Sequence, residues 1–285
     1  MLDRQILEAI RTGRSSPPDL ASIVIPHYRT EELVRLCLRA VRRMTDHPFE
    51  AIVVDNNSRD ASLEYLRGVR WIRLIERGDR AEDNPVAAHG AAMDEGLRAA
   101  RGRWLVSLHT DTIIRRRGWL GELITRLKAD PRAACLGSGK IDTESGWYRA
   151  IKALCSKQRI RAAGRRLLRI PADEKCREAR WYPRSYCAIY DLERVRSLAL
   201  SFRAAPDRAA GELLYQGLLD AGSTCVRLAP AEMQQFVEHV GHATALIGRG
   251  GLGHWRGNQK VGGRLRRVMA SGLARELLGD ESLDR

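Results

Sequence analysis

The sequence predicts an α/β fold in which helices wrap a mostly parallel central sheet. Short runs rich in β-branched residues alternate with stretches of helical spacing from about residue 22 to residue 128. Apolar strands separated by helices are typical of a parallel sheet that is covered on both faces. With 285 residues, 44% of them hydrophobic, the chain is long enough for one large core of this kind.

The predicted elements follow from changes in the spacing of apolar residues. The first strand ends at Pro26, and from Thr30 onwards the apolar residues Leu33, Leu36 and Val41 recur at helical intervals. The same change predicts strands over 22–26, 51–54, 71–75 and 104–108, with helices from about 30, 60, 86 and 118. Beyond residue 130 we expect strands over 134–137, 186–190 and 224–228, and helices over 208–221 and 261–278.

The two ends of the chain differ from this pattern. Residues 1–12 predict a short amphipathic helix, and the Ser-Ser-Pro-Pro sequence at 15–18 cannot continue it. The helix over 261–278 is amphipathic and carries four arginines on its polar side. We therefore divide the chain into an N-terminal helix and linker (1–18), a main domain (19–245) and a basic amphipathic C-terminal extension (246–285).

Composition limits the location and the partners of the protein. The formal charge of +14 attracts phosphate groups. The sequence holds no apolar run long enough to span a membrane and no secretory signal, so we expect a cytoplasmic protein. The six cysteines are spread singly, which predicts buried free thiols. Only 6% of residues are aromatic and no nucleic-acid-binding module is recognisable, so nucleic acid is not an expected partner.

Polar residues follow three of the predicted strands directly. They occupy positions 26–29 (Pro-His-Tyr-Arg), 55–58 (Asp-Asn-Asn-Ser) and 109–112 (His-Thr-Asp-Thr). In an open parallel sheet the ligand lies beyond the carboxyl ends of the strands, so these residues are the first candidates for a binding site. None of them forms a glycine-rich dinucleotide-binding or P-loop motif, and a nucleotide there would be held by side chains.

The order and spacing of these motifs resemble family 2 glycosyltransferases, which have the GT-A fold. The similarity covers about residues 21–128 and also includes the stretch 89–97, in which the family more often has Asn at the position of Asp94. It implies an inverting reaction, in which a base deprotonates an acceptor hydroxyl that then displaces a nucleoside diphosphate from the sugar. The main domain would then comprise a nucleotide-sugar-binding half (19–130) and an acceptor-binding half (131–245).

The resemblance also implies which residues bind the donor. They are the residues at the strand ends and one helical position: Pro26, Tyr28, Asp55, Asn57, Asp94, His109 and Asp111. Asp55 would accept hydrogen bonds from the base or the ribose, although an Asp-Asn-Asn-Ser sequence also forms turns without any ligand. UDP-linked or dTDP-linked sugars are the favoured donors.

A divalent cation, Mn²⁺ or Mg²⁺, is implied as the cofactor. Asp111 would be its ligand because these ions prefer carboxylate oxygens, while the alternative is that Asp111 or Thr112 caps a helix. His109 stands where the family has the first Asp of its Asp-x-Asp motif, and imidazole suits Mn²⁺ better than Mg²⁺. His239 resembles a late family histidine that returns to the metal, although His239 and His242 also have the spacing of a zinc pair.

The catalytic base is implied to be a carboxylate near the start of the helix that ends at Gly222. Glu212 and Asp207 are the candidates, because Asp220 lies at the wrong end of that helix. Asp207 follows Pro206 and precedes Arg208, an arrangement that suits a helix cap or a local ion pair. We therefore choose Glu212 as the base and keep Asp207 as its alternative.

A strongly basic segment lies in the acceptor-binding half. From residue 149 to residue 170 there are eight Lys and Arg residues and no acid. Such a run is often a solvated face, but it also fits an anionic membrane surface at which a lipid-linked or cell-surface glycan acceptor is bound. Two rival functions remain open from the sequence alone: an inactive family member that binds sugar nucleotides, and a sugar-nucleotide nucleotidyltransferase.

Overall fold

The computed structural model describes residues 19–78, 84–140, 181–203, 205, 208–248 and 255–285. The described residues of Met1–Gly139 and Tyr182–Arg285 form one compact unit. The predicted helix at 1–12, the basic segment 149–170 and Asp207 lie outside the described residues.

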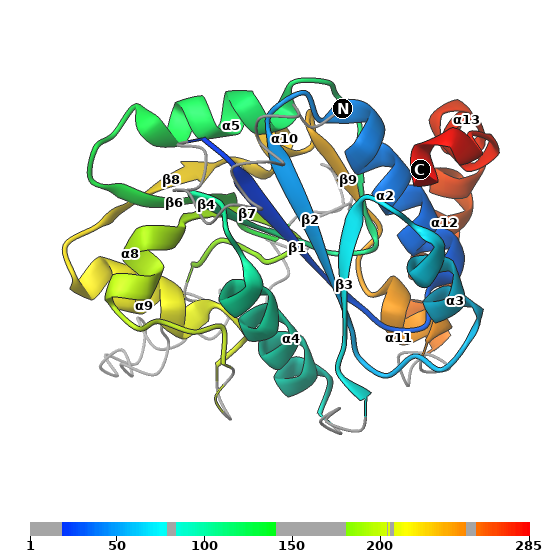
Figure 1. Cartoon of the computed structure of the whole chain (residues 1–285), viewed down its shortest axis with the longest axis horizontal. Coiled ribbons are helices and arrows are strands. Elements are labelled where there is room, and N and C mark those ends of the chain that lie inside the picture. Colours follow the sequence, from blue (N-terminus) through cyan, green and yellow to red (C-terminus); the bar gives the residue numbers. More distant parts are fainter. Residues whose placement is uncertain (1–18, 79–83, 141–180, 204, 206–207, 249–254) are drawn as a thin grey trace, which may run out of the picture. The chain divides into compact units, whose positions relative to one another are not determined.

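A seven-stranded sheet forms the centre of the unit (Figure 1). Its strands are β1 (Ala21–His27), β2 (Phe49–Asp55), β3 (Ile72–Glu76), β4 (Trp104–Leu108), β6 (Ala133–Ser138), β7 (Cys187–Asp191) and β8 (Thr224–Leu228). Their order is β3-β2-β1-β4-β7-β6-β8, and β7 alone runs antiparallel to both of its neighbours. The predicted mostly parallel sheet is therefore confirmed.

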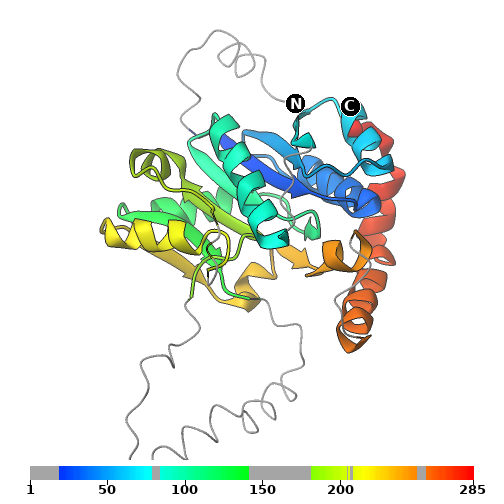
Figure 2. The same cartoon turned by 90° about the horizontal axis from the view of Figure 1, so that it is seen from below.

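Helices pack on both faces of this sheet, as Figures 1 and 2 show. The helices on one side are α4 (Pro85–Ala99), α8 (Leu192–Ser197) and α9 (Glu212–Asp220). Those on the other side are α2 (Glu31–Met44), α3 (Ala61–Gly68), α5 (Trp119–Lys128), α12 (Trp255–Met269) and α13 (Gly272–Gly279). The strands β1, β2 and β4 between these layers are almost entirely buried, which explains their continuous apolar sequences.

A second, two-stranded sheet lies beyond the end of β4. It pairs β5 (Thr112–Ile114) with β9 (Val237–His239) in antiparallel register, with Thr112 opposite His239 and Ile114 opposite Val237. The short helices α10 (Pro230–Met233) and α11 (Ala243–Ile247) precede and follow β9. This pairing joins segments more than 120 residues apart in the sequence.

Two predicted helices have different boundaries in the structure. Helix α9 begins at Glu212 rather than at residue 208, because Gly211 adopts a left-handed conformation (φ 85°) in front of it. The single helix predicted over 261–278 is two helices: α12 ends at Met269, and Ser271 caps α13 by accepting a hydrogen bond from the amide of Ala274. The thiols of Cys37, Cys135 and Cys187 are free and buried as predicted, whereas Cys225 is half-buried.

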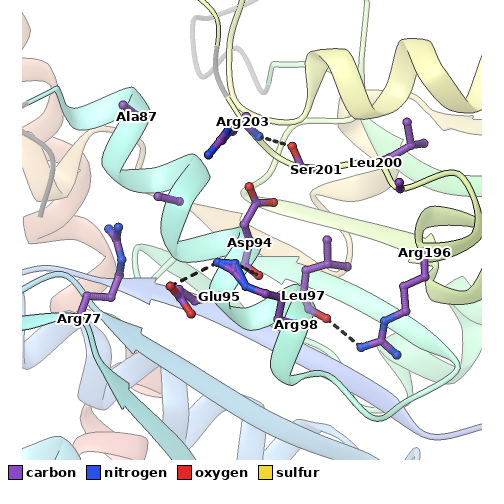
Figure 3. Close-up of a pocket in the computed structure, with 12 residues that line it drawn as sticks. Arg77, Ala87, Asp94, Glu95, Leu97, Arg98, Arg196, Leu200, Ser201 and Arg203 are labelled. Carbon is purple, nitrogen blue, oxygen red and sulfur yellow. Dashed lines mark hydrogen bonds and ion pairs between the residues drawn. The ribbon is translucent and has the colours of Figure 1, made fainter. Parts of the chain in front are cut away.

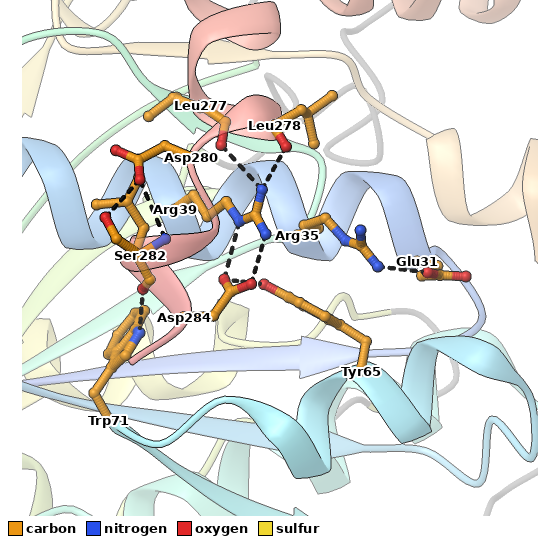
Figure 4. A network of polar contacts seen from close by, with 11 residues as sticks. Glu31, Arg35, Arg39, Tyr65, Trp71, Leu277, Leu278, Asp280, Ser282 and Asp284 are labelled. Carbon is orange, nitrogen blue, oxygen red and sulfur yellow. Dashed lines mark hydrogen bonds and ion pairs between the residues drawn. The ribbon is translucent and has the colours of Figure 1, made fainter.

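The C-terminal helices are attached to α2 through Arg39 (Figure 4). Its side chain is buried, and its guanidinium donates two hydrogen bonds, of 2.9 and 2.6 Å, to the carboxylate of Asp284. The remaining Nη1 donates to the carbonyls of Leu277 and Leu278, and Tyr65 also donates to Asp284. Asp284 lies in the 3₁₀ helix η2 (Glu281–Asp284), so one buried cation fixes both α13 and η2.

Among the described residues, every helix is too short or too polar to cross a membrane. This agrees with the hydropathy of the sequence.

We expect the Arg39–Asp284 pair to contribute strongly to stability. Asp284→Asn leaves a buried guanidinium without its carboxylate, which should lower the free energy of unfolding by about 2 to 3 kcal/mol. Urea denaturation measures this change, and Glu281→Gln, an exposed acid of the same 3₁₀ helix, is the matched control. Equal stability of the two variants would show that the pair contributes little.

We also expect His27 to make stability depend on pH. His27 is buried, its Nε2 lies 2.8 Å from Ser62 Oγ, and burial lowers its pKa to about 4, an effect that Asp55 opposes only in part. Between pH 6.5 and pH 4 the unfolded chain binds a proton that the folded chain does not, so stability falls as the pH falls through this window. Relative to His27→Asn, the wild type should lose roughly 2 kcal/mol more between about pH 7 and about pH 4.5. Identical losses in urea denaturation at the two pH values would contradict this role.

Candidate metal centre

Three potential metal ligands lie together where β4 ends and β5 begins. His109 and Asp111 occupy the turn between these strands, which is closed by a hydrogen bond from the amide of Thr112 to the carbonyl of His109. His239 is the last residue of β9, and the pairing of β9 with β5 places it opposite Thr112. The potential ligand atoms of His109, Asp111 and His239 all lie within 4.8 Å of one another.

The spacing of these atoms fits a single cation. His239 Nε2 lies 3.2 Å from Asp111 Oδ1, and His109 Nδ1 lies 3.7 Å from the same oxygen. A cation bound about 2.1 Å from each ligand places neighbouring ligand atoms about 3 Å apart. His239 Nε2 is buried and, apart from this approach to Asp111, has no hydrogen-bond partner among the described residues, so its lone pair can be offered to a metal.

Asp111 is a buried carboxylate that remains ionised. Burial alone would raise its pKa, but His239, His109 and the amide of Ala243 outweigh that effect and hold the pKa well below its usual range. The amide of Ala243, at the start of α11, donates to Asp111 Oδ2 at 3.2 Å, and the amide of Val240 donates to the carbonyl of Asp111. Asp111 therefore offers Oδ1 to a cation while Oδ2 and its main chain connect it to the segment after β9.

Ser185 orients the ring of His109 through the nitrogen that does not face Asp111. Its hydroxyl oxygen lies 2.9 Å from His109 Nε2 and 3.1 Å from Nε2 of His89, which projects from α4. A hydroxyl can donate to one imidazole and accept from the other. Burial lowers the pKa of both histidines, to about 4 for His89, so both are neutral at neutral pH and able to act as ligand or acceptor. Partners of this kind fix the orientation of metal-binding histidines.

Sequence reasoning missed the supporting residues of this cluster. His89 lies in the stretch 89–97 that carried the resemblance, but no spacing rule connects it with Ser185, 96 residues away. Tyr186, just before β7, stacks on His239 with ring centroids 4.6 Å apart. The signal in the sequence was that Ser185 and Tyr186 stand at the start of the strand predicted over 186–190. This position does not indicate that they contact the histidines.

The other strand-end residues lie in a separate turn after β2. Both oxygens of Asp55 accept from Ser58, one from its hydroxyl at 2.5 Å and one from its amide at 2.9 Å. Asn57 has a left-handed backbone (φ 64°) in this turn, and its side-chain oxygen accepts from Arg59. The structure thus gives Asp55 the turn-forming contacts that the sequence left open, and a contact with a nucleotide stays a prediction.

Pro26 and Tyr28 lie at the end of β1, and Asp94 lies elsewhere. Pro26 is level with Val54 of β2, and the Tyr28 ring lies 5.1 Å from the guanidinium carbon of Arg29. Asp94 is five residues beyond His89 in α4, about 140° around the helix. Its carboxylate accepts a hydrogen bond from the amide of Phe202 at 2.7 Å.

Asp94 lines a cleft of about 720 Å³ between α4 and the segment that follows α8 (Figure 3). The cleft is also lined by four arginines: Arg77, Arg98, Arg196 and Arg203. It contains none of the three potential metal ligands. We therefore place the candidate site at the metal cluster, where three potential metal ligands lie together, and not in this cleft.

Glu212 is the first residue of α9. Its carboxylate accepts from Arg208 Nη1 at 3.2 Å and from the amide of Ala209 at 3.4 Å, and the side chain is largely buried. Helix α9 leads into β8, which runs in the same direction as β4. Since the helix runs back before this strand, its first residue, Glu212, lies towards the carboxyl ends of the strands, where β4 also ends. The alternative base, Asp207, lies outside the described residues.

The fold defines a class of protein, that of the GT-A glycosyltransferases. Residues 22–188 match the family described as Glycosyl transferase family 2. This is more than half of the chain, which therefore belongs to family 2 of the glycosyltransferases.

Two further proteins show similarity to the chain. The putative glycosyltransferase EpsH of Bacillus subtilis (strain 168) is 29% identical over 94 residues, which are 32% of this chain and 25% of that protein. The mannosyltransferase PcManGT from Pyrobaculum calidifontis, solved in complex with GDP-Man and Mn²⁺, superposes with a TM-score of 0.51 at 16% identity. That superposition covers 96% of this chain and 85% of the mannosyltransferase, and it supports the fold.

We predict that Asp111→Asn abolishes the binding of Mn²⁺. The amide oxygen can still accept from Ala243, so the fold should persist, but the anionic ligand is lost. Calorimetric titration with MnCl₂ measures the affinity, and Asp220→Asn, at the end of α9, is the control for removing an acid elsewhere. Unchanged Mn²⁺ affinity in Asp111→Asn would exclude the cluster as the metal centre.

Proposed function

We propose that the protein is an inverting glycosyltransferase, which moves a hexose or deoxyhexose from a nucleoside-diphosphate sugar to an acceptor hydroxyl. The observation that carries the proposal is the His109–Asp111–His239 cluster at the end of β4, in a chain that belongs to family 2. A cation held at this edge of the sheet lies where ligands of open α/β sheets bind.

His109, Asp111 and His239 would hold the cation, which supplies positive charge to a diphosphate leaving group. Two imidazole ligands favour Mn²⁺ over Mg²⁺, and the mannosyltransferase of the same fold was solved with Mn²⁺. His89 and Ser185 would keep the His109 ring in its ligating orientation. A histidine at position 109, where the family has the first Asp of its motif, is therefore compatible with metal binding.

The end of β1 and the turn after β2 would contact the nucleoside. The carboxylate of Asp55 would accept hydrogen bonds from the base or the ribose in addition to those from Ser58. Asn57 and Tyr28 are half-buried, so their side chains are open enough to reach a ligand. UDP or dTDP remains the favoured nucleotide. Asp94 contacts Phe202 instead, so its contribution to donor binding would be indirect.

Glu212 would deprotonate the acceptor hydroxyl. The support is its place at the start of α9, its burial and its acidic side chain, which lies beside Arg208 and a main-chain amide. The acceptor oxygen attacks the anomeric carbon as its proton passes to Glu212, and the nucleoside diphosphate leaves towards the cation site.

The acceptor would be a cell-surface glycan or its lipid-linked precursor, bound by the second half of the chain. The basic segment 149–170 supports this proposal through its charge alone, which would draw the protein to the anionic inner face of the cell membrane.

A donor screen tests the proposed reaction. The protein is incubated with UDP-, dTDP- and GDP-linked sugars and Mn²⁺, and the released nucleoside diphosphate is measured with and without candidate acceptors. We expect release from one donor class, stimulated by an acceptor and stopped by EDTA. Binding without any turnover would support the inactive family member, and release of pyrophosphate from a nucleoside triphosphate and a sugar phosphate would support a nucleotidyltransferase.

We predict that Glu212→Gln lowers kcat by about 10²- to 10⁴-fold, because the amide cannot take the acceptor's proton. Donor and Mn²⁺ affinities should remain near those of the wild type, since the change affects only the transition state. Asp220→Asn is the control on the same helix. Near-normal kcat in Glu212→Gln together with a collapse in Asp207→Asn would transfer the role to Asp207.

A further inference from the structure

Arg264, from the middle of α12, reaches the metal cluster. Its Nη1 lies 3.7 Å from the position that a β-carbon would take on Gly241, and the His239 ring lies 3.5 Å from the same point. Gly241 has a left-handed backbone (φ 70°) in the turn between β9 and α11. The absence of a side chain at Gly241 therefore lets an imidazole of the cluster and a guanidinium of α12 approach each other.

The charge of Arg264 acts on the same carboxylate as the two histidines. Burial lowers the pKa of Arg264, and Asp111 favours its charged form. A cation at the cluster would bring two positive charges close to this half-buried guanidinium and to the carboxylate of Asp111. Those positive charges would repel one another unless an anion bound between them.

Arg266, two residues further along α12, does not share this position. Arg266 and Arg267 are exposed, whereas Arg264 is half-buried and faces Gly241. Two residues along a helix correspond to about 200° of rotation, so Arg266 points away from the cluster. Within the amphipathic C-terminal extension, Arg264 thus has a different environment from the exposed arginines that follow it.

We propose that Arg264 binds the diphosphate of the donor together with the cation, an assignment that rests on the proposed function. A guanidinium presents paired donors that match phosphate oxygens. The diphosphate gains negative charge as its bond to the sugar breaks, so a fixed cation beside it stabilises the leaving group. The C-terminal extension is then a part of the active site.

The test compares Mn²⁺ affinity with diphosphate affinity in the full chain. Arg264→Gln should weaken the binding of inorganic pyrophosphate and of UDP, dTDP or GDP, each with Mn²⁺, by about tenfold or more. The same variant should bind Mn²⁺ alone as well as the wild type or better, because a positive charge near the cation has been removed. Arg266→Gln, with the same loss of charge on the exposed side of α12, should change neither affinity.

A parallel loss of Mn²⁺ and diphosphate binding in Arg264→Gln would overturn the proposal, because it would indicate a structural role. Unchanged diphosphate binding would overturn it as well. If Arg264→Gln does not fold, Arg264→Lys provides the test: its Mn²⁺ affinity should be unchanged while diphosphate binding falls several-fold, since Lys keeps the charge and loses the paired donors. If the wild type binds no diphosphate with Mn²⁺, the proposed function itself fails.

Discussion

The buried carboxylate of Asp111 is the constraint on which the candidate site depends. It lies in the turn after β4, and its Oδ2 and carbonyl accept from the amides of Ala243 and Val240, which flank the turn after β9. A carboxylate removed from water is stable only when such partners surround it. The same contacts that satisfy Asp111 therefore hold β9 against β5 and bring His239 to the cluster, so local stability and the geometry of the ligands have one origin.

Local patterns predicted the first half of the fold well. The strands β1, β2 and β4 are continuous apolar runs because both of their faces are buried, and the polar residues that follow them lie at one edge of the sheet. The predicted start of α9, at about residue 208, was wrong. The helix begins only after Gly211, whose left-handed backbone separates it from the preceding segment. The contribution of Ser185 to the cluster could not be predicted, because it is a contact between positions 76 residues apart.

The C-terminal extension shows how composition alone can mislead about a segment. Its arginines suggested a basic surface, yet the segment is fixed to α2 by Arg39 and Asp284, 245 residues apart, and it carries Arg264 to Gly241. Arg39 itself belongs to the apolar face of α2, where a sequence pattern would expect a hydrophobic residue. Its burial is explained only by the carboxylate and carbonyls of a partner that is distant in sequence.

We propose that a nucleoside diphosphate and a divalent cation bind together at the end of β4. The most direct measurement is a thermal-shift screen of UDP, GDP, dTDP and CMP, each with Mn²⁺ and with EDTA. A ligand present at about 100 times its Kd stabilises the folded state by about 2.7 kcal/mol, which raises the melting temperature by several degrees. We predict such a shift for one nucleoside diphosphate in Mn²⁺ and none in EDTA. An equal shift in both conditions, or no shift with any nucleotide, would contradict it.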